Sequence, residues 1–154
     1  GKVKNLAYFT SLHNQIYNRF NVEYVDVKQF HLNAKYSKKI NRIIDLKINL
    51  DYYNWDQNVY NSPSFYANFA TPINLRGKIK VNPSIRYIGK RMVKDQNIAS
   101  LPSYFHANLY FYYVYSKQLS AYLQLNNLTN SKEDLWFGYR EVGFNGLFGV
   151  SFSF

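Results

Sequence analysis

The last stretch of the chain, residues 144–154, alternates between two kinds of side chain. One set is large and apolar and the other is mostly small, and the chain stops on an aromatic residue. The two sets are Phe148, Val150, Phe152 and Phe154, and Leu147, Gly149, Ser151 and Ser153. Because successive side chains of a strand point to opposite faces, this pattern predicts a strand with an apolar environment on one face and small or polar groups on the other.

The composition fits a sheet of such strands. The chain holds 16 Tyr, 12 Phe and 2 Trp, yet its mean hydropathy is −0.40. No run approaches the ~18 apolar residues of a membrane helix, whereas a membrane strand needs only ~9–11 residues. The sequence therefore predicts an all-β fold, a transmembrane antiparallel outer-membrane β-barrel with an apolar outside and a wet inside.

Alternating segments come in hairpin pairs. The clearest pair is 104–115 with 119–126, and the upstream pairs are 68–75 with 79–87 and 30–36 with 44–52. The segment 30–36 belongs to a longer second strand near 20–37. Together with a weaker first strand near 2–10 and the terminal strand, the expected number is about eight. Pro72 and Pro83 each remove a ladder donor, so we expect them at edges or bulges.

Connections alternate in length along the chain. Short turns are expected near 38–42, 76–78 and 116–118, and long loops near 11–19, 54–63, 91–102 and 129–143. Barrels of this class have short periplasmic turns and long extracellular loops. We therefore expect the outer membrane of a Gram-negative bacterium, with both termini periplasmic.

A soluble β-sandwich is the alternative, because its strands also have one apolar face. Here the apolar faces are longer than an ordinary strand of about five or six residues and are rich in Tyr and Phe toward their ends. These features favour the membrane barrel.

The C-terminal half carries a series of distinctive segments. They are Leu101 to Tyr115, Leu119 to Asn130 with its ending Asn126-Asn-Leu-Thr-Asn130, Trp136-Phe-Gly-Tyr139, Gly143, the last strand ending in Phe, and Tyr87-Ile-Gly-Lys-Arg91. In their order along the chain they resemble the C-terminal end of TonB-dependent receptors. The resemblance is fairly specific over 85–154 and general upstream. It implies an outer-membrane receptor that imports scarce nutrients such as metal chelates or glycans. Its implied partners are outer-membrane lipids, the barrel assembly machinery, the rest of its own receptor chain, TonB and a surface lipoprotein.

The sequence departs from that family in lacking a plug domain and in having about eight strands where the family barrel has about 22. We interpret residues 1–154 as one β-barrel segment, the C-terminal part of a larger receptor. The alternatives are a small eight-stranded structural barrel and an accessory subunit of a larger outer-membrane assembly. If the chain is a receptor segment, its first and last strands should not pair with each other. The start, Gly1-Lys-Val-Lys-Asn5, has no initiator Met and no apolar signal region, so we expect a mature chain or a piece of a longer one.

The alternation assigns side chains to lipid or lumen. Lipid-facing residues are predicted to be Leu46, Leu50, Ile79, Ile85, Leu109, Phe111, Leu123, Phe148 and Val150. Lumen-facing residues are predicted to be Lys35, Asp45, Lys47, Asp51, Lys80, Arg86, Gln124 and Ser151. The charges among the latter either guide an anionic ligand or are ordinary solvated interior groups, and the second reading is favoured.

Two further groups of residues are candidates for function. The candidate ligand-binding residues are Trp55, Tyr60 and Tyr66 near one loop and Trp136, Phe137 and Tyr139 near another, since aromatic rings can stack on sugar or chelate faces. The same rings also suit the girdle at a membrane interface, which is the favoured reading. Phe148, Val150, Phe152 and Phe154 are expected to form the signal that the barrel assembly machinery engages.

Several other functions are not expected. With no Cys and three scattered residues His13, His31 and His106, we predict neither a metal site nor a cofactor. The net charge is +10, and Lys and Arg crowd the predicted turns and one strand face instead of clustering with exposed stacking aromatics, so no nucleic-acid partner is expected. No nucleophile elbow or phosphate loop is present, and we predict no enzyme. Asn127-Leu-Thr129 matches a glycosylation sequon, and we interpret it as a strand end.

Overall fold

The computed structural model describes residues 1–14, 17–94 and 100–154 and is built of strands and their connections. Its strands are β1 (Lys2–Asn14), β2 (Tyr17–Lys39), β3 (Asp45–Trp55), β4 (Phe65–Ala70), β5 (Ile73–Leu75), β6 (Ile79–Ile88), β7 (Arg91–Met92), β8 (Ser100–Leu101), β9 (Tyr104–Val114), β10 (Leu119–Asn126), β11 (Asp134–Trp136), β12 (Tyr139–Arg140) and β13 (Asn145–Phe152). Within these ranges no helix is long and apolar enough to cross a membrane.

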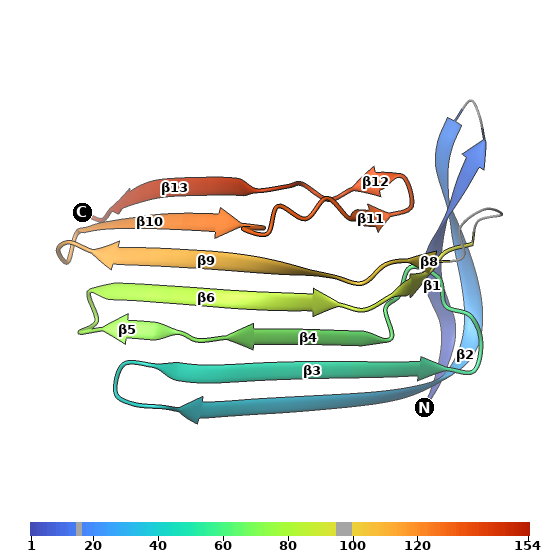
Figure 1. Cartoon of the computed structure of the whole chain (residues 1–154), viewed down its shortest axis with the longest axis horizontal. Coiled ribbons are helices and arrows are strands. Elements are labelled where there is room, and N and C mark those ends of the chain that lie inside the picture. The colour runs from blue at the N-terminus through green and yellow to red at the C-terminus, as the bar shows by residue number, and fades with distance from the viewer. Residues whose placement is uncertain (15–16, 95–99) are drawn as a thin grey trace.

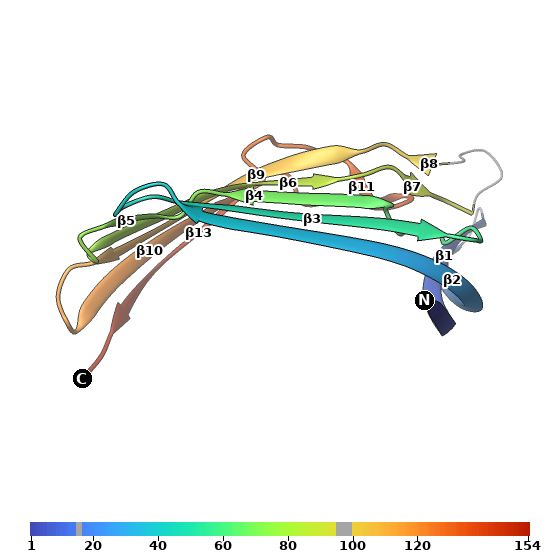
Figure 2. The ribbon, with the colours of Figure 1, turned by 90° about the horizontal axis from the view of Figure 1, so that it is seen from below.

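One antiparallel sheet of nine strands forms the body of the molecule. Its order is β1-β2-β3-β4-β6-β9-β10-β13, and β5 pairs with β6. Neighbours in the sheet are therefore neighbours in sequence, as short hairpins require. The expected strands from 20–37 onward are all found, and the sheet is strongly curved (Figures 1 and 2).

Short turns and long loops lie at opposite ends of this sheet. The β2–β3, β5–β6 and β9–β10 turns lie at the end that we call the turn end, at the left of Figure 1. The other end, the loop end, carries the small hairpins β7–β8 and β11–β12. Both hairpins fall within expected long loops, although 95–99 of the loop near 91–102 lie outside the described residues.

The first strand differs from the prediction. β1 pairs with the first half of β2, from Lys2 opposite Lys28 to Asn14 opposite Tyr17, whereas β3 pairs with the second half, from Gln29 opposite Trp55 to Lys39 opposite Asp45. The β1–β2 hairpin therefore extends beyond the loop end of the sheet. The long loop expected at 11–19 is strand at 11–14 and 17–19, and residues 15–16 lie outside the described part.

The same register corrects the expected place of the termini. Gly1 lies beside Gln29, whose backbone N–H donates to the Gly1 carbonyl oxygen at 2.7 Å, at the loop end. The C-terminus lies at the turn end (Figure 1). The prediction that both termini lie on the same side is wrong, because β1 begins opposite the middle of β2 rather than at a turn.

Pro83 lies inside β6 without disturbing the sheet. On the side of β6 that pairs with β4 and β5, Pro83 lies opposite the gap between these two strands. Its carbonyl oxygen accepts the Thr71 N–H at 3.1 Å. The Pro72 carbonyl accepts the Asp45 N–H at 2.9 Å. Both prolines thus lie where the ladder is interrupted between β4 and β5, although β6 is an interior strand and the register carries no bulge there, unlike the expected edge or bulge.

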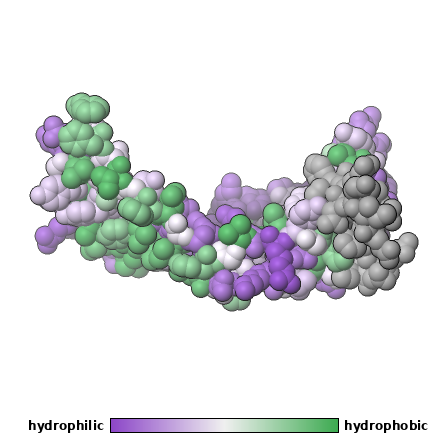
Figure 3. Space-filling model, turned by 90° about the horizontal axis from the view of Figure 1, so that it is seen from above, coloured by the Kyte–Doolittle hydropathy of each residue, from purple (hydrophilic) through white to green (hydrophobic). Residues whose placement is uncertain are grey.

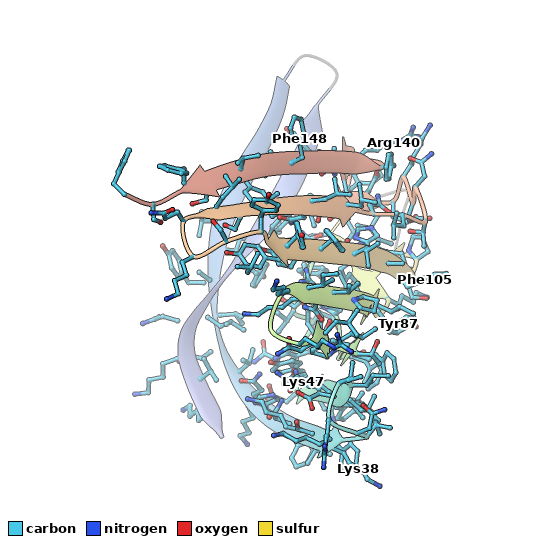
Figure 4. All side chains as sticks on the ribbon, turned by 90° about the vertical axis from the view of Figure 1, so that its left-hand side faces the viewer. Lys38, Lys47, Tyr87, Phe105, Arg140 and Phe148 are labelled. Carbon is cyan, nitrogen blue, oxygen red and sulfur yellow. The ribbon has the colours of Figure 1, made fainter. Side chains whose placement is uncertain are left out.

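The two faces of the sheet differ in chemistry along its whole width. Residues directly opposite each other share a face, so the register links Leu50 to Ala67, Ile85 to Phe69, Phe111 to Leu123 and Leu123 to Phe148. Figure 4 places Tyr87 and Phe105 on the convex side and Lys47 toward the concave side. In Figure 3 apolar residues follow much of the outer curve and hydrophilic ones gather in the hollow.

We call the convex apolar side chains the apolar band. Its strongly exposed members are Phe30, Leu32, Tyr36, Leu50, Tyr52, Phe69, Ile85, Tyr87, Phe105, Tyr113, Leu123, Phe148, Val150 and Phe152. Buried apolar side chains are instead few, and Val59, Val93, Leu101 and Tyr104 among them gather at the loop end. A fold with so little core and so wide an exposed apolar face is suited to an apolar solvent.

Candidate functional site

The concave face collects the predicted lumen charges. Lys35, Asp45, Lys47, Asp51, Lys80, Arg86, Gln124 and Ser151 all fall on this one face by register, and all nine predicted lipid-facing residues fall on the other. The prediction that the two sets occupy opposite faces is confirmed by these pairings. That they meet water and lipid stays a prediction.

Asp51 is the centre of a polar network on β2 and β3. Its carboxylate receives Asn33 Nδ2 at 2.7 Å and Asn49 Nδ2 at 2.8 Å, and lies 2.9 Å from His31 Nε2. Three side chains from two strands thus hold one carboxylate in place. The network presents amide and imidazole groups in fixed positions on the concave face, which suits hydrogen bonding to a surface laid against it.

The cationic side chains of this face stand apart from that network. Lys35, Lys47, Lys80 and Arg86 are all exposed, and Lys80 Nζ lies 5.9 Å from the centre of the Tyr112 ring. Asp45 lies opposite Lys39 at the turn end. The structure therefore spreads the predicted charges along the face and does not bring them into one pocket.

Four rings form a row at the loop end of the concave face. His31 stacks on Tyr53 with ring centres 4.2 Å apart, Tyr53 stacks on Trp55 at 5.7 Å, and Tyr66 meets Tyr53 edge-on at 6.4 Å. We call His31, Tyr53, Trp55 and Tyr66 the aromatic row. Tyr53, Trp55 and Tyr66 line an open hollow of about 230 Å³ together with Gln29, Val59 and Pro63.

The other predicted ligand-binding aromatics lie elsewhere. Tyr60 contacts Tyr8 of β1, with ring centres 5.5 Å apart. Trp136, Phe137 and Tyr139 belong to the β11–β12 hairpin, and β4, β6 and β9 separate Trp55 from β10 along the sheet. The predicted residues thus do not form one group, because Trp55 and Tyr66 belong to the aromatic row and the others lie apart from it. Sequence reasoning missed Tyr53, although the alternation of β3 places it on the concave face with Trp55.

Arg91 fixes the β11–β12 hairpin to the sheet. Its guanidinium is buried, donates to the carbonyl oxygens of Leu135 at 2.6 Å and Asp134 at 2.7 Å, and lies 5.1 Å from the Tyr104 ring centre. Nearby, His106 Nδ1 lies 3.5 Å from Glu141 Oε1. The planar guanidinium fork suits two carbonyl acceptors at once, so the loop aromatics are held by a residue about forty positions upstream in sequence.

Asn127 ties the next loop to the end of β10. Its Nδ2 donates to the carbonyls of Ser131 and Val142 at 2.8 and 3.0 Å, and its Oδ1 accepts Thr129 Oγ1 at 2.9 Å. The residue is only 3% exposed and has φ +50°, a region that Asn tolerates better than most residues. The strand-end interpretation of the Asn127-Leu-Thr129 sequon agrees with this burial.

Known proteins resemble this chain in structure and not in sequence. No family model matches the sequence, and no curated protein matches it either. Among solved structures, the pyoverdine outer membrane receptor FpvA from Pseudomonas aeruginosa PAO1 superposes with a TM-score of 0.69 over 99% of this chain and 26% of its own, at 18% identity. The copper transporter OprC gives 0.72 over 99% and 28%, at 16% identity. The ferric-catecholate import receptor Fiu from E. coli K12 in its open form gives 0.66 over 84% and 21%, at 16% identity.

The chain has the fold of part of an outer-membrane receptor barrel. The structures that it resembles are TonB-dependent receptors, and it spans about a quarter of their length. The likeness agrees with the family resemblance of the C-terminal half. The Asp51 network and the aromatic row lie on the concave face of this sheet.

The last strand of the receptor-barrel sheet carries the predicted assembly residues. Phe148, Val150 and Phe152 extend the apolar band from β13, and Phe148 is 79% exposed. Phe154 lies beyond the end of β13 and contacts the Phe152 ring edge-on at 5.5 Å. Their role in assembly stays a prediction.

Within the described residues no group of three or more His, Asp or Glu side chains could hold a metal ion. The similar structures are transport receptors rather than enzymes.

Proposed function

We propose that this chain forms part of the barrel wall of a TonB-dependent nutrient receptor in the outer membrane of a Gram-negative bacterium. The observation that carries the proposal is the unbroken register from β2 to β13, which keeps one apolar face and one polar face over the whole curved sheet. The convex apolar band would contact outer-membrane lipids. The concave face would meet the plug of the receptor, which TonB acts on.

Open edges support a larger barrel over a small closed one. β1 and β13 stand at the two ends of the strand order, and residues 29–39 of β2 pair on one side only, with β3. In hydrocarbon each unpaired backbone group costs several kcal/mol, so both edges require further strands. We infer that these strands come from the same receptor rather than from a partner subunit.

The aromatic row is the proposed ligand-contacting part. Stacked rings with exposed faces bind planar or ring-bearing molecules, and the row lies at the loop end where a nutrient would enter. We infer a metal chelate or a glycan as the nutrient, with Trp55 making the outermost contact of the row. Trp136, Phe137 and Tyr139 would contact the ligand from the β11–β12 hairpin, and a surface lipoprotein would cover the loops.

Two measurements test this proposal. The intact mass of the protein purified from native outer membranes should be well above the 18.3 kDa of this chain. A mass near 18.3 kDa without a bound partner would establish the small barrel instead, and the same mass with a stable partner would establish the accessory subunit.

The second measurement uses the absence of Cys from the chain. Single cysteines at Leu50 and Asp51, adjacent residues of opposite faces, should differ in labelling. A water-soluble maleimide should react with Asp51→Cys and not with Leu50→Cys in intact membranes. Equal labelling of both would contradict a membrane barrel.

A further inference from the structure

The turn end of the sheet carries a cluster of cations. Six Lys and Arg side chains lie in or beside its three hairpin turns, all are exposed, and Asp45 is the one carboxylate at these turns. We call the six the basic rim: Lys38, Lys39, Arg42, Arg76, Lys78 and Lys117. The loop end, in contrast, carries both signs, with Glu23, Asp56 and Asp134 among its acidic residues.

Like charges on neighbouring turns repel one another unless an anion lies among them. Hairpin turns need no cations for their geometry, because the turn bonds here are made by other groups. Asn41 Oδ1 accepts the Ile43 and Ile44 N–H groups at 2.8 and 2.9 Å, and Asn74 Oδ1 accepts the Gly77 N–H at 3.0 Å. The side-chain charges of the basic rim are therefore not needed for these bonds, although the Lys78 backbone N–H donates to the Leu75 carbonyl oxygen at 3.1 Å within its turn.

A hollow of about 620 Å³ opens between two of these turns. Its lining includes the cations Lys39 and Arg42, the amides Asn41 and Asn74, and the carboxylate Asp45. Both amide oxygens accept bonds within the turns, so the hollow offers two cations and amide donors, together with the Asp45 carboxylate and the apolar Ile43 and Pro72. A phosphate group is an anion that such a hollow can hold.

Apolar side chains stand directly beside the cations. Ile40, Ile43 and Leu75 are 54%, 43% and 39% exposed, although each lies next to a charged residue of the turns. Lys38 shares the convex face with Leu46 and ends the apolar band at the lower edge of the sheet in Figure 4. A boundary that needs both an apolar contact and an anion is the headgroup layer of a membrane leaflet rather than free solution.

We propose that the basic rim binds the phosphate groups of anionic glycerophospholipids in the leaflet that surrounds the turn end of the barrel. The proposal rests on the proposed membrane function and names one lipid class for this part of it. Lys38, on the convex face, and Arg42 hold one headgroup, and Ile40 and Ile43 contact its acyl chains.

The test uses the full chain as its native cell produces it, reconstituted in nanodiscs containing equal amounts of phosphatidylglycerol and phosphatidylcholine. Native mass spectrometry then counts the lipids that stay bound. The parent protein should retain phosphatidylglycerol at least about threefold over phosphatidylcholine, and the preference should fall as salt rises from about 0.05 to about 0.5 M. Equal retention of the two lipids in a correctly inserted protein would overturn the inference and leave the barrel proposal intact, whereas failure to enter the nanodisc would overturn the barrel proposal.

Variants locate the site. The triple change Lys38→Gln, Lys39→Gln and Arg42→Gln should abolish the preference. A control, Lys2→Gln, Lys4→Gln and Lys28→Gln, removes the same charge from the loop end and should keep it. Loss of the preference in both variants would show that net charge alone decides. Full displacement of the lipid by millimolar inorganic phosphate would show a site for free phosphate, and either result would overturn the proposal.

Discussion

The ring of Tyr122 lies over Gly149 on the neighbouring strand, so that a Cβ atom at position 149 would come within 2.6 Å of the ring atoms Cε1 and Cζ and of the hydroxyl oxygen. The two residues are directly opposite in the β10–β13 ladder, on the concave face. Gly149 thus provides the space that an aromatic ring of β10 fills, which fixes the ring against the last strand of the sheet.

Replacing Gly149 with Ala should destabilise the folded barrel by about 1–3 kcal/mol, because the new methyl group forces the Tyr122 ring away from its position. The loss can be measured from the urea midpoint of unfolding in detergent, followed by the heat-dependent shift in gel mobility. Ser151→Ala, two residues along the same face of β13, should change the midpoint little.

The double variant Gly149→Ala with Tyr122→Ala separates the two causes. If the ring is responsible, adding Gly149→Ala to Tyr122→Ala should cost much less than adding it to the parent protein. Equal costs in both backgrounds would mean that the methyl group acts on the backbone of β13 rather than on the ring.

Arg91→Lys should release the β11–β12 hairpin. A lysine keeps the charge and loses the planar fork that reaches the carbonyls of Asp134 and Leu135 together. We expect faster amide hydrogen exchange over residues 134–140 with the exchange of β10 unchanged. Lys90→Gln, an exposed neighbour, is the matched control, and protection of the hairpin that is the same in Arg91→Lys as in the parent would contradict the role of the fork.

Acid should loosen the contact between the β1–β2 hairpin and the segment after β7. Both Glu23 oxygens accept Lys94 Nζ at 2.8 Å, and this bond, followed by the one from Tyr8, lowers the pKa of the Glu23 carboxyl, while the same bond to Glu23 raises the pKa of Lys94. A lowered folded-state pKa stabilises the contact above the ordinary Glu pKa, and this stabilisation is lost as pH falls from that value through the lowered one.

Limited proteolysis of the β1–β2 hairpin across that pH range checks the expectation. Cleavage should increase toward acid in the parent protein. In Glu23→Gln it should be high at every pH and nearly constant, because the titrating group is gone. A parent and a variant with the same pH profile would assign the effect to another carboxyl group.

The parts of the fold that the sequence predicted well are those that the two-sided environment constrains. β3 is the clearest case, because Asp45 and Leu46 begin an alternation that continues to Tyr52, and a slip of one residue would reverse every side chain. The β1–β2 hairpin was predicted less well. It extends beyond the loop end of the other strands, and its side chains do not alternate between apolar and polar as those of β3 do.

The loop end shows the second limit. Arg91 belongs to the Tyr87-Ile-Gly-Lys-Arg91 motif. Its hydrogen bonds to Asp134 and Leu135, 43 and 44 positions away, depend on the pairing of β6 with β9, which brings the two loops together. The aromatic row was half predicted for a similar reason. Trp55 and Tyr66 stand out as aromatic residues near a predicted loop, whereas Tyr53 has the position of an ordinary strand residue and joins them only through the β3–β4 pairing.

Phe154→Asp should impair outer-membrane assembly far more than it lowers the stability of protein that has already folded. Phe154 lies past the end of β13, is fully exposed, and places its ring edge-on against the Phe152 ring, so the folded state loses little without it. Recognition of the chain end during assembly, in contrast, would depend on the terminal aromatic ring. We expect strongly reduced surface levels by extracellular protease shaving. For the protein refolded in detergent, we expect a free energy of unfolding within about 0.5 kcal/mol of the parent.

Ser153→Asp places the same charge one residue earlier and leaves the aromatic ring in place, so it should assemble well. Surface levels of Phe154→Asp equal to those of the parent would show that assembly depends on other features of the last strand.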